Sequence, residues 1–406
     1  MSHSETERSF GPALRAARER RGLTQADVAA QLGVKRETIS HWESGKHLPR
    51  PKQSARLDAA LQTDGNLRAL IDQAREAPTL SSTDDAAESV LEVFRRVQRA
   101  IESYLQLDAN GRPLGWCHNL QQGLPPTPLS TAYGIRILHL IDETSISRLG
   151  DFAECLRRMQ QPGGGWAIKS QSAPSPEATA GVIDALVRVD PGMDVSPYVD
   201  LMLSEIDKEA RKRPAIVTWI LETILDLRPD SPAVRDLIGE VLDLRRPSGR
   251  NRRVLWSQKA EPNLARPDPS PYHTARACAV LRRAGLVGAV PSDLTGRVDD
   301  ALEIGVGWLT GLREVENTSE VFQRPGDGPP NSAFFRHFSA SWVLRALLLC
   351  GVLPTHPTVS GTLGKVWSDF DDEHSLWRWS NGDLPIWMTF DGLATLRIAA
   401  LAALPH

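Results

Sequence analysis

Cysteine is scarce in this chain of 406 residues, which has only Cys117, Cys155, Cys278 and Cys350. They lie far apart and form no Cys-x-x-Cys pair, which argues against a zinc ribbon and against a disulfide framework. We therefore expect a protein of the reducing cytoplasm.

Long apolar runs and nucleotide-binding loops are also missing. No predominantly apolar stretch reaches the ~20 residues that a membrane-spanning helix needs, and the N-terminus lacks the apolar core of a signal peptide. The phosphate-loop pattern G-x-x-x-x-G-K-[ST] is absent, so we expect no ATP-driven switch and no cofactor. The length predicts two or three domains. From the lack of apolar runs we expect no membrane partner.

The N-terminal part of the chain predicts a series of short helices. A first helix over Phe10–Arg21 ends at Gly22, a residue that suits the position after a helix. Thr24 can cap the second helix with Asp27 as its acidic partner. Gly33 then supplies a tight turn, because a left-handed backbone there excludes side chains with a Cβ.

The helix after this turn has a buried face and an exposed face. Ile39 and Trp42 are spaced to lie inside, which leaves polar side chains such as Arg36 facing outward. Two more helices are indicated by their apolar residues, Leu57 and Leu61 in the fourth and Leu67, Leu70 and Ile71 in a short fifth.

These features closely resemble the phage-repressor (XRE/Cro-type) DNA-binding domain over Phe10–Ala74. The shared motif is Leu-Thr-Gln, then Leu-Gly-Val, then Thr-Ile-Ser-x-Trp-Glu-x-Gly. In that family the helix after the turn enters the major groove and its first residues contact base edges. The resemblance implies a double-stranded DNA operator as partner and assigns DNA contacts to Gln25, Lys35, Arg36, Glu37, Thr38, Ser40, His41, Lys46, Arg50 and Lys52.

The assigned side chains differ in their expected roles. Arg36 can pair with guanine and Glu37 can accept from cytosine, whereas Gln25 stands where the family contacts a phosphate. Lys35 departs from the family, which usually has a small capping hydroxyl there, so it is expected to reach a phosphate instead.

Charge is unevenly distributed along the chain. Residues 8–56 hold 11 Lys/Arg and 4 Asp/Glu, a balance of +7, whereas the whole chain carries −3, so the remainder carries −10. A basic head on an acidic body is typical of a DNA-contacting module joined to a domain with another partner.

Beyond a polar linker at Ala77–Ala87, helical periodicity continues to the end and nothing resembles a strand ladder. Twelve segments carry apolar residues at helical spacing: Val90–Leu107, Pro128–Ile141, Leu149–Gln160, Ser175–Val189, Val199–Ala210, Pro214–Leu227, Pro232–Leu244, Pro271–Gly285, Leu294–Leu312, Phe334–Cys350, Thr358–Phe370 and Ile386–Ala403.

Every second segment opens with a similar signature of small polar residues. Its anchors are Thr131, Thr179, Thr218, Thr274, Ser341 and Thr389, which recur about every fifty residues. One helix pair per repeat predicts a curved or closed array. We expect an all-α chain in which six pairs close into an α6/α6 toroid, with an open TPR-like array as the alternative.

A second resemblance supports the toroid. Gln160, Gly164 and Trp166 match the Gln-x3-Gly-x-Trp core of the prenyltransferase and squalene-cyclase repeat, in which glutamine and tryptophan lock outer helices to inner ones. Trp256 and Trp308 belong to more degenerate copies. The similarity covers about Val90–His406 as a fold pattern, with one good motif.

The same resemblance raises the question of catalysis. Asp369, Asp371 and Asp372 spell the Asp-x-Asp-Asp acid of terpene cyclases, but they follow an outer helix, which predicts a solvated turn. The Asp-x-Cys pair of zinc-dependent prenyltransferases is absent, and Cys117–His118 or His273 with Cys278 are the nearest substitutes. We expect neither a metal nor a catalytic residue.

Aromatic and acidic residues on the inner helices are candidates for a ligand pocket. Trp219, Trp342, Trp387 and Asp391 are placed there, whereas Trp166, Trp256 and Trp308 are expected to pack between repeats. Capping is the simpler role for Asp391.

The sequence thus predicts a dimeric, non-enzymatic transcription regulator. Its domains are a five-helix DNA-binding domain (1–76), a linker (77–87) and a toroid (88–406) that senses a small molecule or docks a protein. Two alternatives stay open: an enzyme of terpenoid or prenyl chemistry with a DNA-binding head, and a protein-interaction scaffold.

Overall fold

The computed structural model describes residues 10–43, 49, 51–63, 65–68, 70, 83–142, 146–168, 174–248, 253–259, 268–324 and 331–403. Contacts divide the chain into two compact units, Met1–Ser82 and Thr83–His406. Helix α6 begins at Thr83. The predicted linker is therefore too long at its C-terminal end, because residues 83–87 form the first turn of α6.

The described residues of the first unit include the helices α1 (Phe10–Arg20), α2 (Gln25–Leu32), α3 (Arg36–Glu43) and α4 (Pro51–Leu61). The predicted capping of α2 is confirmed: Thr24 and Asp27 form a reciprocal capping box, and Gly33 ends the helix at φ 67°. A left-handed backbone at Gly33 turns the chain sharply between α2 and α3.

A small apolar core holds these helices together. Leu14, Ile39 and Leu57 are fully buried, and Trp42 is nearly so. Residues 66–68 are helical and bury Leu67, as expected for a fifth helix, but Ile71 lies outside the described residues.

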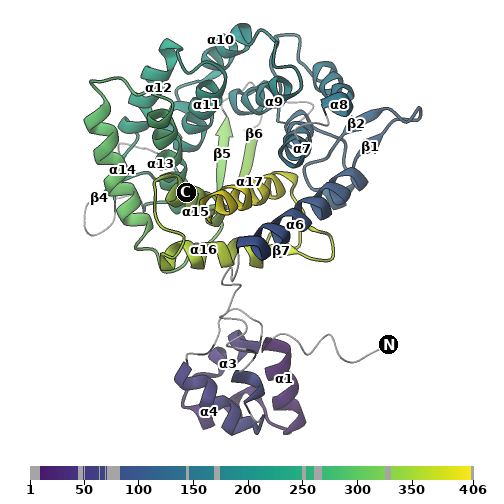
Figure 1. The fold of residues 1–406 in the computed structure, drawn as a ribbon, viewed down its shortest axis with the longest axis vertical. Coiled ribbons are helices and arrows are strands. Elements are labelled where there is room, and N and C mark those ends of the chain that lie inside the picture. The colour runs from purple at the N-terminus through teal and green to yellow at the C-terminus, as the bar shows by residue number, and fades with distance from the viewer. Residues whose placement is uncertain are drawn as a thin grey trace. The chain divides into compact units, whose positions relative to one another are not determined.

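The second unit is a double ring of helices (Figure 1). The outer helices are α6 (Thr83–Ser103), α8 (Ile146–Arg158), α10 (Ser196–Glu205), α12 (Pro232–Asp243), α14 (Thr295–Leu309) and α16 (Pro357–Ser368). The inner helices are α7 (Pro128–Ile141), α9 (Pro176–Val189), α11 (Pro214–Leu227), α13 (Pro271–Leu286), α15 (Ser339–Leu349) and α17 (Ile386–Ala403).

The inner helices form a closed circle. Each contacts the next one along the chain, and the last, α17, contacts both α7 and α6. All six predicted anchor residues lie on inner helices and are fully buried. The predicted α6/α6 toroid is thus confirmed, and the open TPR-like array is wrong.

Inner helices begin where the sequence supplies a hydroxyl followed by a proline. Thr127, Ser175 and Ser270 each accept a hydrogen bond from the backbone N–H three residues later. Proline at the next position costs no hydrogen bond, because the first helical N–H groups have no partner within the helix. Local chemistry therefore sets where each of these inner helices begins.

Four buried tryptophans join outer to inner helices. Each indole N–H donates to the carbonyl two residues before the end of the preceding outer helix: Trp116 to Ile101 (2.8 Å), Trp166 to Leu156 (2.7 Å), Trp256 to Val241 (2.7 Å) and Trp377 to Val366 (2.8 Å). These carbonyls belong to the last turn, where a helix offers no partner of its own. We call these contacts the indole clamps; they confirm the packing role predicted for Trp166 and Trp256.

The anchor residues complete each clamp. The hydroxyls of Thr131, Thr179 and Thr389 accept the backbone N–H of Trp116, Trp166 and Trp377 at 3.4, 3.1 and 3.3 Å. Thr274 donates to the carbonyl of Trp256. One tryptophan thus fixes the end of an outer helix and the start of the next inner helix.

Short antiparallel hairpins connect several helices, which the sequence analysis did not predict. They are β1 (Gln106–Leu107) with β2 (Pro113–Gly115), β3 (Arg246–Ser248) with β4 (Arg253–Leu255), β5 (Thr318–Arg324) with β6 (Asn331–His337), and β7 (Phe370–Asp371) with β8 (Leu376–Trp377). Single-turn 3-10 helices cover Leu120–Gln122 and Ala210–Lys212.

The β5–β6 hairpin corrects one predicted boundary. The helix expected from Phe334 starts only at Ser339, since residues up to His337 pair with β5 in a seven-residue register. Phe334, Phe335 and Phe338 supplied apolar positions that fit either period, so periodicity alone did not separate strand from helix.

No helix among the described residues is long and apolar enough to cross a membrane. The four cysteines are free thiols, and Cys117, Cys155 and Cys278 are buried.

Replacing Gly392 tests the fit between tryptophan and inner helix. A Cβ on Gly392 of α17 would lie 2.4 Å from the ring of the buried Trp377. Gly392→Ala is therefore expected to destabilise the toroid by about 1–3 kcal/mol through overpacking, measured by chemical denaturation. Gly239→Ala in α12 is the matched control, because no heavy atom lies within 4 Å there; it should stabilise by about 0.5–1 kcal/mol. Equal effects of both substitutions would contradict the packing described.

Removing one indole N–H tests the clamps. Trp166→Phe removes the indole donor and leaves the Leu156 carbonyl with only the backbone N–H of Met159 at 3.1 Å, so we expect a loss of about 1 kcal/mol in the free energy of unfolding, plus a cavity contribution. Trp308→Phe, at a partly exposed tryptophan that packs on the same core, should cost less than half as much. Comparable losses would show that the clamp hydrogen bond is unimportant.

Candidate functional site

The exposed face of α3 carries the side chains predicted to read DNA. Arg36, Glu37 and Ser40 are exposed, whereas Ile39 and Trp42 of the same helix are buried. A helix whose inner face is fixed in a core can present its outer face rigidly to a groove.

Glu43 at the end of α3 ties three helices together. Its carboxylate accepts from Arg18 of α1 through two contacts of 2.5 and 3.1 Å and from Gln25 of α2 at 2.8 Å. A bidentate arginine–carboxylate pair restricts orientation as well as distance. The predicted phosphate contact of Gln25 stays a prediction, and its side-chain amide is held by Glu43 in this structure.

The remaining predicted DNA contacts are spread around this helix. Lys35 is exposed, and its carbonyl accepts the backbone N–H of the partly buried Thr38 at 3.0 Å. His41 is partly buried. Lys46 and Arg50 lie outside the described residues, and only the backbone of Lys52, within α4, is described.

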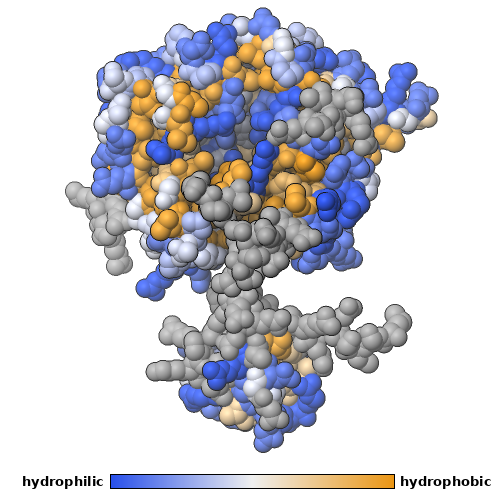
Figure 2. All heavy atoms as spheres, viewed as in Figure 1, coloured by the Kyte–Doolittle hydropathy of each residue, from blue (hydrophilic) through white to orange (hydrophobic). Residues whose placement is uncertain are grey.

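A second cluster lies on the inward faces of the ring. We call it the central basin: Tyr133 and Arg136 of α7, Trp219 and Glu222 of α11, Arg276 of α13, Trp342 and Arg345 of α15, and Phe390 and Asp391 of α17. Figure 2 shows a hollow at the centre of the ring, with hydrophilic spheres inside it. The side chains of Arg136, Glu222 and Arg345 keep 15, 22 and 12% of their surface exposed.

Guanidinium groups lie over aromatic rings in the basin. Arg276 and Arg345 lie 4.3 and 4.0 Å from the ring centroid of Trp342, and Arg136 lies 4.0 Å from that of Phe390. Such cation–π contacts are stronger away from water. They hold the arginines inside the ring without using all of their hydrogen-bond donors.

Each basin guanidinium has a carboxylate partner. Glu222 pairs with Arg276 at 2.8 Å, and Asp391 accepts from the Trp342 indole at 3.2 Å and lies 3.5 Å from Arg345. Arg136 pairs with Asp184 of α9 at 2.7 Å, so the three basin guanidiniums are matched by three carboxylates. Nε and Nη1 of Arg345 are buried and form no hydrogen bond with any described residue, although Nη1 lies at ion-pair distance from Asp391.

Burial shapes the protonation of these groups. Burial raises the pKa of Asp391, although Arg345 and Arg276 oppose that rise. Burial lowers the pKa of Arg345, while Glu222 and Asp391 oppose it. Burial is the largest cause of both shifts, as expected for charged groups removed from water.

Three of the four predicted pocket residues meet in the basin. Trp219, Trp342 and Asp391 lie there, whereas Trp387 is buried elsewhere on α17 with its ring 6.0 Å from that of Trp379. Sequence reasoning missed the basin arginines. Arg345 is the one charged residue in the apolar run SASWVLRALLL, and such an isolated charge indicates a buried polar site.

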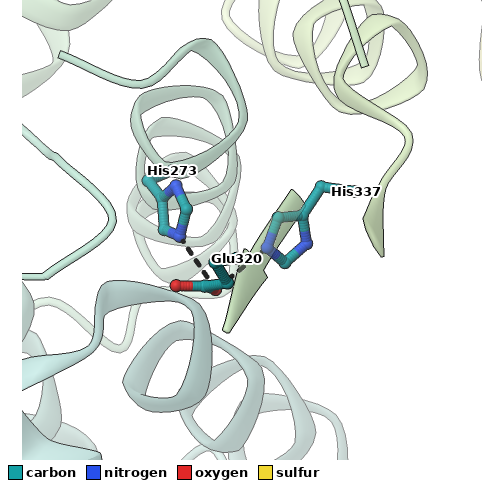
Figure 3. Close-up of side chains that lie close together, drawn as sticks. All are labelled: His273, Glu320 and His337. Atoms are coloured by element: carbon teal, nitrogen blue, oxygen red, sulfur yellow. Dashed lines mark hydrogen bonds and ion pairs between the residues drawn. The ribbon is translucent and has the colours of Figure 1, made fainter. Parts of the chain in front are cut away.

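A third cluster, the hairpin triad, lies where the β5–β6 hairpin meets α13 (Figure 3). Oε1 of Glu320 on β5 lies 2.9 Å from Nε2 of His337 on β6 and 3.4 Å from Nε2 of His273 on α13. All three residues are buried. Arg213, just before α11, approaches the other carboxylate oxygen at 3.2 Å.

The triad carboxylate is ionised and its His337 partner neutral near neutral pH. Burial tends to raise the pKa of Glu320, but hydrogen bonds from both histidines outweigh it and hold that pKa below its usual range. Burial lowers the pKa of His337 to about 4, with the contact to Glu320 opposing the shift. The triad therefore offers an ionised carboxylate beside a neutral imidazole.

Tyr272 links the triad to the basin. Its ring stacks on His337 with centroids 3.8 Å apart, and its hydroxyl accepts from Arg276 at 3.1 Å. The two clusters are thus neighbours that share one aromatic residue.

The Asp-x-Asp-Asp motif follows outer helix α16 as predicted, but it is only partly solvated: Asp371 ends strand β7 and is buried, whereas Asp372 is exposed. Asp371 accepts from the backbone and ring of His374 and pairs with Arg378 at 2.8 Å. Asp369 contacts Lys365, and the exposed Asp372 contacts Arg96 of α6. Burial tends to raise the pKa of Asp371, but the hydrogen bonds from His374 outweigh it, so the pKa lies below its usual value. An acid that protonates an alkene needs the opposite shift.

The predicted substitutes for a zinc site do not form. Cys117 donates to the carbonyl of Asn119 at 2.8 Å. A Cβ on Gly305 would lie 2.4 Å from the Cys278 sulfur, so that thiol packs against α14. The structure instead brings His273 to Glu320 and His337, residues 47 and 64 positions away in sequence.

Comparisons with known proteins agree with both parts of the fold. A family profile described as a helix-turn-helix domain matches residues 9–71. No curated protein matches the chain by sequence. A solved D-mannose isomerase is similar in fold, with 10% identity, a TM-score of 0.52, and coverage of 81% of this chain and all of that one.

A family 76 glycoside hydrolase from a bovine Bacteroides thetaiotaomicron strain is also similar, with 10% identity, a TM-score of 0.49, and coverage of 77% of each chain. The C-terminal unit shares its fold with the D-mannose isomerase, and the N-terminal unit contains a helix-turn-helix domain.

Proposed function

We propose that this protein is a sequence-specific transcription regulator whose toroid binds a small anionic ligand in the central basin. The observation that supports the regulator most directly is the helix-turn-helix domain, with Arg36, Glu37 and Ser40 exposed on a helix whose other face is buried. The basic balance of residues 8–56 favours the approach of DNA phosphates.

The chemistry of the basin supports the ligand class. Nε of Arg345 forms no hydrogen bond with any described residue and Nη1 lies 3.5 Å from Asp391, so an anionic group that competes with Asp391 can accept from both. Glu222 and Asp391 can accept from hydroxyl groups, and the aromatic rings of Trp219 and Trp342 offer apolar faces. A small hydroxylated anion such as a hexose phosphate combines these requirements.

Ligand binding would act on DNA through the relative placement of two DNA-binding domains. Domains of this type read half-sites about one helical turn apart as dimers, so we propose a homodimer in the cytoplasm. The resemblance to the prenyltransferase and squalene-cyclase repeat is carried by Gln160, Gly164 and Trp166, and terpenoid chemistry has no further support in the turn that holds Asp371. A protein-docking scaffold is the remaining alternative.

An enzyme acting on sugars is a second candidate. A toroid of the same fold occurs in a D-mannose isomerase, and the basin holds carboxylates beside guanidiniums. Turnover of a bound hexose phosphate, followed by nuclear magnetic resonance of the sugar, would favour this candidate over a sensor.

Replacing Arg36 tests the DNA-reading face. Duplexes selected by the full chain from a random pool supply the operator. Arg36→Ala should weaken binding to it by about 1–3 kcal/mol, the usual worth of an arginine contact to guanine, with little change on unrelated DNA. Fluorescence anisotropy across a salt series measures both.

The matched control for this experiment is Arg15→Ala. Arg15 is exposed on α1 and pairs with Glu19, so its loss should leave discrimination between operator and unrelated DNA intact. Unchanged operator affinity of Arg36→Ala, or an equal loss in both variants, would contradict the assignment of α3.

Replacing Arg345 tests the basin. Mannose 6-phosphate at 100 times its Kd should raise the free energy of unfolding by about 2.7 kcal/mol, whereas neutral mannose at the same concentration should not. Arg345→Met keeps the length of the side chain but removes the donors, so the thermal shift should disappear.

Arg297→Met is the control, because Arg297 lies exposed on outer helix α14. It should respond to mannose 6-phosphate as the unmodified chain does. A panel of hexose phosphates and sugar acids that leaves the melting temperature unchanged would refute the proposed ligand class.

A further inference from the structure

We infer that His273, Glu320 and His337 form a binding site for one divalent transition-metal ion. The sequence analysis expected no metal, and the ion proposed here is independent of the ligand proposed for the basin. Each residue offers one ligand atom, and these atoms all lie within 4.8 Å of one another.

The distances in the triad fit a shared ion. Zinc binds imidazole nitrogen and carboxylate oxygen at about 2.0–2.2 Å, which places neighbouring ligand atoms about 3.0–3.4 Å apart for angles between 90° and tetrahedral. The observed Nε2–Oε1 separations are 2.9 Å for His337 and 3.4 Å for His273. Little movement is therefore needed to convert the hydrogen-bonded triad into a set of ligands.

The surroundings orient the ligand atoms. Nδ1 of His273 lies 2.8 Å from the Ser270 hydroxyl, which can accept a hydrogen bond from Nδ1–H; in that tautomer Nε2 carries no proton and can bind a metal. Arg213 holds Oε2 of Glu320 at 3.2 Å and thereby leaves Oε1 for the ion. The stack of Tyr272 on His337 fixes the plane of the second imidazole.

The ligand types select the class of metal. Two imidazoles and one carboxylate suit Zn²⁺ or Fe²⁺, whereas Ca²⁺ and Mg²⁺ prefer sets of oxygen ligands. Three protein ligands leave at least one position open. Because the ion and Arg213 together exceed the charge of Glu320, an anion such as hydroxide is the favoured additional ligand.

Metal binding would also link separate parts of the ring. His273 belongs to α13, whereas Glu320 and His337 lie on the two strands of the β5–β6 hairpin. An ion would cross-link the hairpin to the inner circle beside the basin, which Tyr272 borders.

Cobalt provides a visible probe for this site. The full chain without an affinity tag is treated with a chelator and titrated with Co²⁺. We expect one ion per chain, with ligand-field absorption that added Zn²⁺ removes. Glu320→Gln and His337→Gln should each weaken binding by more than about 100-fold, since even outer-shell partners of a metal are worth about 10- to 100-fold.

A second cluster supplies the matched control. Asp371, Glu373 and His374 also lie close enough to share an ion, but Glu373 is exposed and His374 partly so. His374→Ala should leave the cobalt spectrum and affinity unchanged. No binding by the unmodified chain, or binding lost in His374→Ala and kept in Glu320→Gln, would overturn the inference.

If circular dichroism shows that a triad variant does not fold, X-ray absorption of the zinc-loaded unmodified chain tests the site by counting imidazole ligands. The triad provides two imidazole ligands, whereas the Asp371 cluster provides one. Two imidazoles would support the triad; one or none would refute it.

Discussion

The indole clamps are the contacts on which the ring depends. Each satisfies a carbonyl in the last turn of an outer helix, where the helix offers no partner of its own, and does so inside a dry core where an unpaired carbonyl is costly. Because the same tryptophan backbone meets the anchor residue of the following inner helix, each clamp fixes the angle between the two helices. The inward faces that form the central basin follow from that angle.

Among the described residues, two of the six repeats show no indole clamp, and both place charged or titratable side chains at the hairpin triad. The connection between α10 and α11 carries a 3-10 turn and Arg213 in place of a clamp. The connection between α14 and α15 carries the β5–β6 hairpin with Glu320 and His337. Structural repetition is thus interrupted where polar residues are buried, as expected when packing gives way to a site.

Local signals allowed much of the fold to be predicted. Thr24, Gly33 and the hydroxyl–proline starts of the inner helices act over a few residues, and the recurring anchors revealed the pairing of helices. The triad was beyond such reasoning, because His273 and His337 are joined only by tertiary contacts. His273 was noticed, but it was paired with Cys278 since that residue is near in sequence.

The basin arginines were missed for a different reason. Apolar periodicity predicts which face of a helix is buried. An arginine on that face breaks the apolar pattern, so it is not predicted to be part of a buried site. In this structure Arg276 and Arg345 are accommodated on the faces of Trp342, an arrangement that needs residues from two helices. The DNA-reading face was predictable because its motif is contiguous, although its contacts with DNA remain predictions.

Closure of the ring has a consequence for synthesis of the chain. Asn119, near the start of the toroid, bonds to Asp383 and Leu384, more than 260 residues later, and α17 contacts α6 and α7. A ribosome must therefore release nearly the whole chain before the circle can close, while the helix-turn-helix domain has all its residues within the first 82. Domains commonly fold in order of emergence. A prematurely terminated product would therefore retain the helix-turn-helix domain without a closed toroid.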